Sequence, residues 1–309
     1  MHFRRVLRGV AIAFCFLAVL GVISIAGRWH ISAYLAKWQG KCLACTYAEA
    51  NEAARSSSAQ HQSYVGEREN VAVIATDGDL SHFSSSLGTF WAPKGTDVAF
   101  LVAEQLDGVY GPIVKDGVVL DCGANIGTFT RLALRQGAAK VIAIEPVEGN
   151  VRSLERNFQD EIKSGRVVVY PKGVWNREEI LEMKEYDNSA LDTFVLQQRS
   201  ESASAPRITR LPVTKIDQIV TKLGLERVDM IKMDVEGAEV KALHGSAETL
   251  QRFRPKLAIA TENQASDVHD VPQTVREIHD GYRLRFGTPS LQSDNAVRPT
   301  VAFFQTDSE

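Results

Sequence analysis

The sequence predicts an α/β domain with a mostly parallel sheet, a C-terminal antiparallel strand pair and an N-terminal transmembrane helix. From residue 118 onward, continuous apolar strands alternate with helical segments, a pattern typical of parallel strands covered by helices on both faces. The last two expected strands, 283–286 and 300–304, are joined by a loop containing Pro and Ser. We expect no crossover helix there, so this pair should be antiparallel.

The transmembrane helix is predicted from residues 9–27, nineteen residues without a charged side chain. At about 1.5 Å per residue, such a helix nearly crosses a hydrocarbon core of about 30 Å. Basic residues precede the run, and Arg28 and Trp29 follow it as interfacial anchors would. A cleaved signal peptide is the alternative, but the length of the run favours an anchor. We expect an anchor at 1–28, a polar juxtamembrane spacer at 29–70 and the functional domain at 71–309.

Within that domain, apolar runs bounded by turn residues predict the strands, and longer amphipathic segments predict the helices. We expect strands at 71–76, 118–120, 140–144, 167–170, 228–233 and 257–261. We expect helices at 97–106, 128–136, 150–158, 240–252 and 271–279, with one more inside 213–223. We expect the stretch between the strand at 167–170 and residue 213 to be irregular. Asn188 and Ser189 within it are candidates for a lid over an acceptor.

Charge and cysteine content disfavour two classes of function, nucleic-acid binding and metal binding. The formal net charge is −3, whereas nucleic-acid partners usually demand a basic face. Cys42 and Cys45 form a CxxC, but no second Cys or His pair follows at zinc-site spacing, so we expect incidental thiols and no metal centre.

A glycine-containing loop follows the strand at 118–120. Asp121 ends the strand, and Gly123, Asn125 and Gly127 precede the next helix. In open α/β sheets, ligands bind beyond the carboxyl ends of the strands. Glycines let the backbone turn tightly and approach a ligand, and the helix N-terminus presents free N–H groups. These residues therefore predict a ligand-binding loop.

An acid at the end of the next strand indicates which ligand. Glu145 lies twenty-four residues after Asp121, where a carboxylate can accept hydrogen bonds from both ribose hydroxyls. An anionic Asp121 beneath the loop would repel a pyrophosphate but could engage an ammonium group. S-adenosyl-L-methionine (SAM) has both a ribose and an ammonium. The sequence contains no Y-x-x-x-K, which disfavours a short-chain dehydrogenase. The alternative is a pair of turn glycines and a surface acid.

Three further acids, Asp234, Glu236 and Glu239, follow the strand at 228–233. Asp234 ends a central strand and should face the same crevice as the glycine loop. We expect it to orient or deprotonate an acceptor hydroxyl, with Glu236 assisting or holding the loop. Glu236 and Glu239 could share one face of the first helical turn, and Glu239 could simply cap that helix. A divalent cation bound by these acids is disfavoured because no His lies beside them. His269 could approach the mouth of the crevice, but a lone loop histidine is more typical of the solvated surface.

Several of these stretches resemble the FkbM family of SAM-dependent methyltransferases: "LDCGANIGTFT", "AIEP" and "IKMDVEGAEVKALHGS", with Leu154 and Asn157 between them. Glu104 and Tyr110 resemble the family's acid and tyrosine before the first strand. The resemblance covers about 97–262 and departs at Cys122, where an aliphatic residue is usual. It implies a Rossmann-like seven-stranded sheet with a final antiparallel hairpin. It also implies methyl transfer, commonly to a hydroxyl of a sugar or natural product.

Together these features predict a membrane-anchored, SAM-dependent O-methyltransferase acting on a small-molecule, sugar or lipid-linked acceptor. Because SAM is made in the cytosol, we expect a cytoplasmic catalytic domain. Two alternatives remain open: a non-catalytic membrane-tethered module with a SAM-binding fold, and an enzyme dependent on NAD or a nucleotide sugar. A nucleobase methyltransferase is disfavoured because no N-P-P-Y-like motif follows the fourth strand.

Overall fold

The computed structural model describes residues 31–32, 35–36, 47–185, 193–194, 207–291 and 296–307. The predicted anchor at 1–28, the CxxC at Cys42 and Cys45, and the lid candidates Asn188 and Ser189 lie outside the described residues. Among the described residues, no helix has the length and apolar character needed to cross a membrane. The anchor, and the domain boundary at residue 70, therefore stay predictions.

The chain divides into two compact units, Met1–Gln62 with Thr288–Arg298, and Ser63–Gly287 with Pro299–Glu309. The smaller unit holds most of α3 (Tyr47–Asn70) and the strand pair β14 (Pro289–Leu291) and β15 (Val297–Pro299). Small alanines of α3, among them Ala50 and Ala53, pack against Val297. The helix α3, 24 residues long, thus forms the C-terminal part of the range 29–70 that was expected to be a polar spacer.

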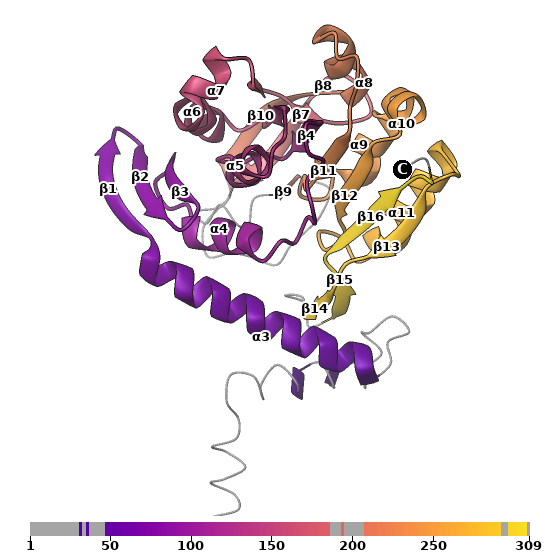
Figure 1. The fold of residues 1–309 in the computed structure, drawn as a ribbon, viewed down its shortest axis with the longest axis horizontal. Coiled ribbons are helices and arrows are strands. Elements are labelled where there is room, and N and C mark those ends of the chain that lie inside the picture. The colour runs from indigo at the N-terminus through magenta and orange to yellow at the C-terminus, as the bar shows by residue number, and fades with distance from the viewer. Residues whose placement is uncertain are drawn as a thin grey trace, which may run out of the picture. The chain divides into compact units, whose positions relative to one another are not determined.

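A seven-stranded mixed sheet forms the centre of the larger unit, in the order β13-β16-β12-β11-β4-β5-β6 (Figure 1). The five strands from β12 to β6 are parallel, and β16 runs antiparallel to both β12 and β13. The expected parallel sheet with an antiparallel end is confirmed. The strands are β4 (Val118–Cys122), β5 (Lys140–Ile144), β6 (Val167–Tyr170), β11 (Met230–Met233), β12 (Lys256–Ala260), β13 (Arg283–Phe286) and β16 (Val301–Gln305).

Helices cover both faces of this sheet because its strands are apolar on both sides. Leu120, Ile142 and Ile231 pack in one core with residues of α8 to α11. The alternate residues Val119 and Val141 pack in a second core with Phe129 of α5. The helices are α4 (Val98–Leu106), α5 (Thr128–Arg135), α6 (Glu148–Asn157), α7 (Gln159–Lys163), α8 (Ile216–Lys222), α9 (Glu239–His244), α10 (Ala247–Phe253) and α11 (Asp267–Ile278).

The single helix expected at 240–252 is wrong, because α9 and α10 are separate helices that break at Gly245. A Cβ on Gly245 would lie 1.9 Å from the carbonyl oxygen of Trp175. The backbone of another segment therefore approaches the chain at this residue, and only glycine leaves room for it.

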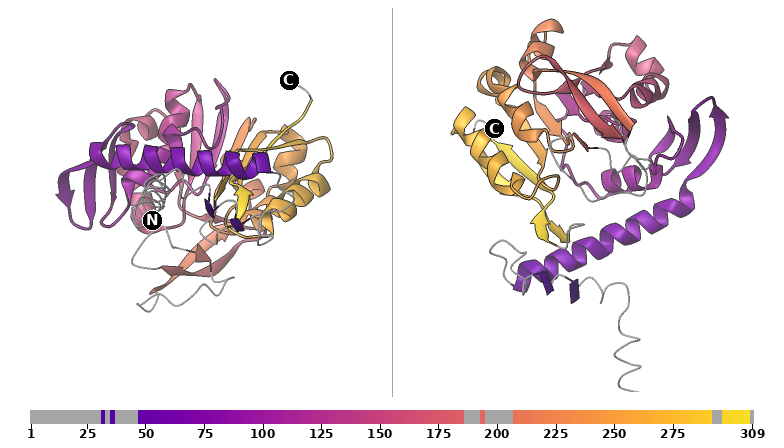
Figure 2. Two further views of the ribbon diagram at one scale, coloured as in Figure 1. Left: turned by 90° about the horizontal axis from the view of Figure 1, so that it is seen from below. Right: turned by 180° about the vertical axis from the view of Figure 1, so that it is seen from behind.

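Two smaller sheets were missed by sequence analysis. The strand expected at 71–76 is present as β1 (Ala72–Asp77), but it belongs to an antiparallel sheet with β2 (Leu80–Ser85) and β3 (Gly88–Pro93). The region expected to be irregular contains a sheet in the order β7-β10-β8-β9. Its strands are β7 (Gly173–Val174), β8 (Glu179–Glu185), β9 (Thr193–Phe194) and β10 (Arg207–Thr214). Figure 2 shows β8 and β10 as a long two-stranded ribbon.

Candidate active site

The glycine loop after β4 and the acidic stretch after β11 are in direct backbone contact. Met233 and Cys122 are register partners on adjacent parallel strands, and the N–H of Asp234 donates to the carbonyl of Cys122 at 3.1 Å. Gly123 has φ +77°, and a Cβ there would lie 1.9 Å from the carbonyl oxygen of Asp234. Glycine is required at 123 because the two strand ends approach so closely.

The end of the loop is shaped by a second glycine. Gly127 has φ +93°, and a Cβ there would lie 2.3 Å from the ring of Phe158. Asn125 also takes a left-handed conformation, with φ +50°, which asparagine tolerates better than most residues. The helix α5 begins at Thr128, directly after this turn. The loop therefore leads into the N-terminal end of a helix, as expected from the sequence.

Glu145, directly after β5, binds the loop. Its Oε2 accepts a hydrogen bond from the N–H of Asn125 at 2.9 Å, and its Oε1 accepts from the N–H of Val147 at 2.9 Å. Burial raises the pKa of Glu145, and these two backbone donors oppose that rise. The side chain of Asn150 is a third donor, with its Nδ2 3.4 Å from Oε1. Since a carboxylate has about four acceptor positions, Glu145 keeps capacity for a hydroxyl donor. Glu145 and Asn125, both predicted to bind the cofactor, are brought together.

Asp121 has a partner that sequence analysis missed. Its side chain is 0% exposed, and its Oδ2 accepts a hydrogen bond from Thr130 Oγ1 at 2.6 Å. Its Oδ1 lies 3.5 Å from Nζ of Lys232, a buried residue of β11. Burial raises the pKa of Asp121, and the ammonium of Lys232 opposes that rise. Lys232 thus already balances the charge of Asp121, which was expected to engage the ammonium group of the cofactor. The contact between Asp121 and that ammonium group therefore stays a prediction.

Asp234 is held by two donors from different elements. Tyr110 Oη donates to its Oδ2 at 2.7 Å, and Asn263 Nδ2 lies 3.3 Å from its Oδ1. Burial raises the pKa of Tyr110 well above its ordinary value, and the charge of Asp234 adds to that rise. Tyr110 therefore keeps its proton and acts as a donor. Asn263 was missed, although it follows a buried strand end in the polar segment "TENQ".

Glu104 completes this group of acids. Its Oε1 lies 3.5 Å from Tyr110 Oη. Burial raises the pKa of Glu104 to about 7, and repulsion from Asp234 adds to that rise. Near neutral pH this carboxyl is therefore divided between its charged and protonated forms. Family resemblance alone had indicated Glu104 and Tyr110, and the structure brings both beside Asp234.

Glu236 and Glu239 do not share one face of a helical turn, the arrangement considered above. Glu236 is exposed in a turn with φ +55°, and α9 begins only at Glu239. Glu239 is buried, and its Oε1 accepts hydrogen bonds from the N–H of Val235 at 2.9 Å and from Asn263 Nδ2 at 2.7 Å. Burial, and then the charge of Asp267, raise the pKa of Glu239 to about 8. Glu239 thus satisfies a backbone donor of the turn, as a capping residue does.

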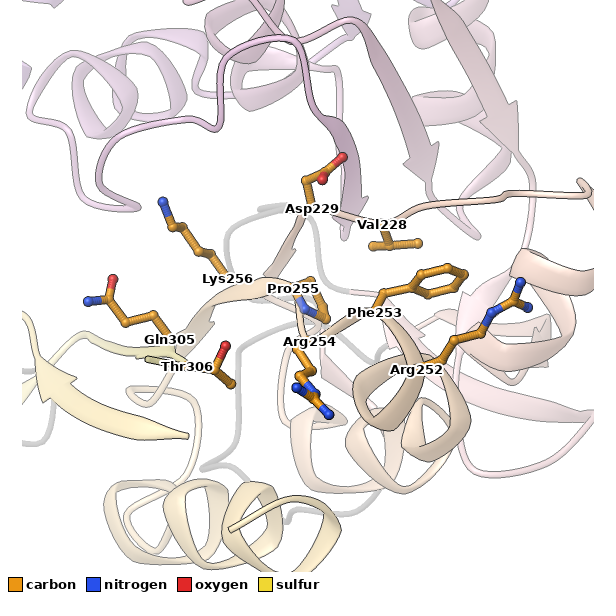
Figure 3. A pocket seen from close by; sticks show the side chains of 9 residues that line it. All are labelled: Val228, Asp229, Arg252, Phe253, Arg254, Pro255, Lys256, Gln305 and Thr306. Carbon is orange, nitrogen blue, oxygen red and sulfur yellow. The ribbon is translucent and has the colours of Figure 1, made fainter. Parts of the chain in front are cut away.

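A polar hollow lies on another part of the sheet, away from this group of acids. The polar hollow in Figure 3 is lined by nine residues, among them Asp229, Lys256 and Thr306. Asp229 precedes β11 and Lys256 begins β12, so this hollow lies at the opposite strand ends from the glycine loop. In the described ranges, no group of three or more His, Cys, Asp or Glu side chains is placed to hold a metal. His269 is exposed.

A protein-family model described as "Methyltransferase FkbM domain" matches residues 121–284 of this sequence. The match covers just over half of the chain. The chain belongs to the FkbM methyltransferase family. The matched range contains the glycine loop, Glu145, Asp234 and Asn263, and it ends within β13.

Individual relatives resemble parts of this chain. Methyltransferase 1 of Beauveria bassiana (strain ARSEF 2860) is 29% identical over 150 residues, which cover 43% of this chain and 60% of that protein. The AMB antimetabolite synthetase AmbE of Pseudomonas aeruginosa is 29% identical over 170 residues, which cover 45% of this chain and 8% of that protein. The matches thus span only part of each of these curated relatives.

Among solved structures, an FkbM methyltransferase from Methylobacillus flagellatus KT has 18% identity and a TM-score of 0.46, covering 83% of this chain and 61% of that chain. A putative methyltransferase from Streptococcus mutans, solved in complex with SAH, has 14% identity and a TM-score of 0.40. It covers 65% of this chain and 95% of that one.

Proposed function

We propose that this FkbM-family chain is a methyltransferase that uses SAM to methylate a hydroxyl group of a sugar, glycan or other small-molecule acceptor. The observation that carries the proposal is the position of Asp234. Its backbone touches the glycine loop, while its carboxylate is held between Tyr110 and Asn263. A carboxylate held by two donors beside a cofactor loop can act on a hydroxyl that is bound there.

The residues of the loop fit SAM in the described structure. Glu145 has acceptor capacity beyond its two backbone donors and the Asn150 side chain, which suits a ribose hydroxyl. The absence of side chains at Gly123 and Gly127 keeps the loop close to the Asp234 backbone and to Phe158. Asn125 connects the loop to Glu145, and Asp121 lies beneath the loop. When bound, SAM supplies a methyl group activated by its sulfonium.

In the proposed reaction, Asp234 would receive the proton of the acceptor hydroxyl as the hydroxyl oxygen bonds to the methyl carbon, while the bond from sulfur to that carbon breaks and the neutral thioether is released. General-base assistance of this kind contributes about 10²–10⁴-fold to a rate. Tyr110 fixes the Asp234 carboxylate and keeps its own proton, so it orients the base without competing for the acceptor proton. Glu236, exposed in the turn after β11, is proposed to assist at the acceptor side.

We extend the proposal to the location of the enzyme. The uncharged run at 9–27 would anchor the chain in a membrane, with the catalytic domain on the cytoplasmic side where SAM is made. An anchored enzyme meets lipid-linked acceptors in two dimensions, which favours that class. Protease treatment of sealed inverted vesicles tests the orientation, since a cytoplasmic domain is cleaved only in the inverted preparation.

The test of the activity combines binding and label transfer. Calorimetric titration of the full-length chain with SAM, S-adenosylhomocysteine (SAH) and NAD should show binding of the first two only. Membranes incubated with methyl-labelled SAM and the wild-type chain should incorporate label into an alkali-stable product, as a methyl ether would. Binding of NAD in place of SAM would overturn the proposal. SAM binding with no label in any fraction would instead support a non-catalytic binding module.

A further inference from the structure

Lys232 is a charged residue in the middle of a buried strand. Its relative exposure is 4%, and it lies between the buried apolar residues Ile231 and Met233 of β11. Its register partner on the adjacent strand β4 is Asp121, and Nζ lies 3.5 Å from Oδ1 of that residue. An apolar side chain would suit this environment, so the presence of a lysine requires a reason.

The ammonium of Lys232 also holds the glycine loop. Nζ donates to the carbonyl oxygen of Gly123 at 2.9 Å and lies 3.5 Å from that of Cys122. Both carbonyls belong to the turn whose conformation brings the Asp234 backbone against Gly123. One side chain of β11 therefore fixes the start of the loop that we assign to the cofactor.

The same ammonium lies near two aromatic rings. Nζ lies 5.1 Å from the centroid of the Tyr110 ring and 5.9 Å from that of Phe129. Burial disfavours the charge of Lys232, yet the carboxylates of Asp121, Asp234 and Glu104 raise its pKa above its ordinary value. Lys232 therefore remains an ammonium inside the protein.

We propose that Lys232 is a positioning residue for methyl transfer: its ammonium fixes the start of the cofactor loop through the carbonyls of Gly123 and Cys122. The inference rests on the proposed function, and it adds a residue that holds the cofactor loop in place. The alternative is that Lys232 serves only as the counter-ion that allows Asp121 to be buried.

Three variants distinguish these roles. Lys232→Met removes the ammonium but leaves Asp121 buried without its partner, and such a change is usually strongly destabilising. The double variant Asp121→Asn/Lys232→Met removes both charges, so no buried charge is left unpaired. Asp121→Asn alone measures what Asp121 itself contributes to SAH affinity. If Lys232 were only a counter-ion, the double variant should recover folding and bind SAH no more weakly than Asp121→Asn does. Lys241→Met, a change at an exposed lysine of α9, is the matched control.

The dependence of turnover on SAM concentration is the decisive measurement, because Nζ contacts the loop through the carbonyls of Gly123 and Cys122. If Lys232 holds the loop, the double variant should raise the KM for SAM more than it lowers kcat. A residue that only balances a buried charge would change neither value once Asp121 is neutral.

We would measure three quantities for each variant: SAH affinity by calorimetry, the midpoint of thermal unfolding, and the rate of label transfer from methyl-labelled SAM to membranes as the SAM concentration is varied. For the double variant we expect near-wild-type unfolding and SAH affinity about tenfold weaker than that of Asp121→Asn, because charge-assisted hydrogen bonds to the loop are lost. A double variant with the same SAH affinity and the same KM for SAM as Asp121→Asn would overturn the inference. If wild-type protein binds SAH but transfers no label, the proposed function fails, whereas SAH affinity in the double variant equal to that of Asp121→Asn refutes the loop role independently.

Discussion

Replacing Gly123 by alanine tests whether the contact between the two strand ends organises the site. The added Cβ would lie 1.9 Å from the carbonyl oxygen of Asp234, at a φ of +77°. Real Cβ atoms do not approach an oxygen this closely, so the Asp234 backbone has to move by about 1 Å or more. Asp234 is the proposed base, so the substitution should disturb the site as well as the fold.

The magnitude has two parts, and the chain offers a control that separates them. Gly165 has nearly the same φ, +75°, and a Cβ there would meet nothing within 4 Å. Gly165→Ala should therefore cost about 1 kcal/mol, the conformational penalty of a left-handed alanine. Gly123→Ala carries the same penalty plus about 1–3 kcal/mol for overpacking, so we expect it to lower the free energy of unfolding by about 2–4 kcal/mol.

Urea denaturation followed by tryptophan fluorescence measures the free energy of unfolding for both variants of the full-length chain. SAH titration of each variant measures the loop itself, and only Gly123→Ala should weaken binding. Equal destabilisation of the two variants, with equal SAH affinity, would refute the claim that close approach of the Asp234 backbone requires glycine at 123.

Three further predictions follow from single side chains. Asp234→Asn should reduce methyl transfer by about 10²–10⁴-fold and leave SAH affinity unchanged in calorimetry, and normal turnover would remove Asp234 from the proposed reaction. The pKa of Glu239 is raised to about 8 from an ordinary 4.5, so the folded state retains a proton that the unfolded chain loses. Wild-type stability at this group therefore falls as the pH rises through that range. Glu239→Gln should reduce the fall measured by denaturation at pH 5.5 and pH 8, and identical slopes would contradict the assignment. Asn157 Nδ2 donates to the carbonyls of Trp91 and Ile126, each at 2.9 Å. Asn157→Asp, which leaves both acceptors unpaired, should lower the free energy of unfolding by about 2–4 kcal/mol, and a change within experimental error in urea denaturation would count against it.

The central sheet could be predicted because its strands are buried on both faces and are therefore continuously apolar. β8 and β10 could not be predicted in the same way. β8 carries Glu179, Glu182 and Glu185 among its seven residues, and no local pattern distinguishes such a strand from a loop. Its pairing with β10 joins segments far apart in sequence. Gly245 gave a similarly weak signal, because the Trp175 carbonyl that requires a glycine there belongs to another segment.

The same distinction between local and long-range signals applies to the residues of the candidate site. Residues whose role depends on their place along one strand, such as Asp121, Glu145 and Asp234, follow from strand ends and glycine spacing. Residues whose role depends on a partner from another strand do not. Lys232 is only one polar residue within an apolar run, and its meaning appears once the register places it opposite Asp121. Asn263 likewise gains significance only because it bridges Asp234 and Glu239.

The pairing of Lys232 with Asp121 also bears on why acids follow a buried strand at this point. Buried ion pairs are weak contributors to stability, since the cost of removing two charges from water often exceeds their attraction. An apolar pair of similar volume would serve the fold at least as well. The ammonium does more than face Asp121, however, because it donates to a loop carbonyl and attracts Asp234. The ammonium of Lys232 offsets the negative charge of the buried Asp121 and also that of Asp234, the acid that follows β11. One cation therefore serves both the interior of the sheet and the candidate site.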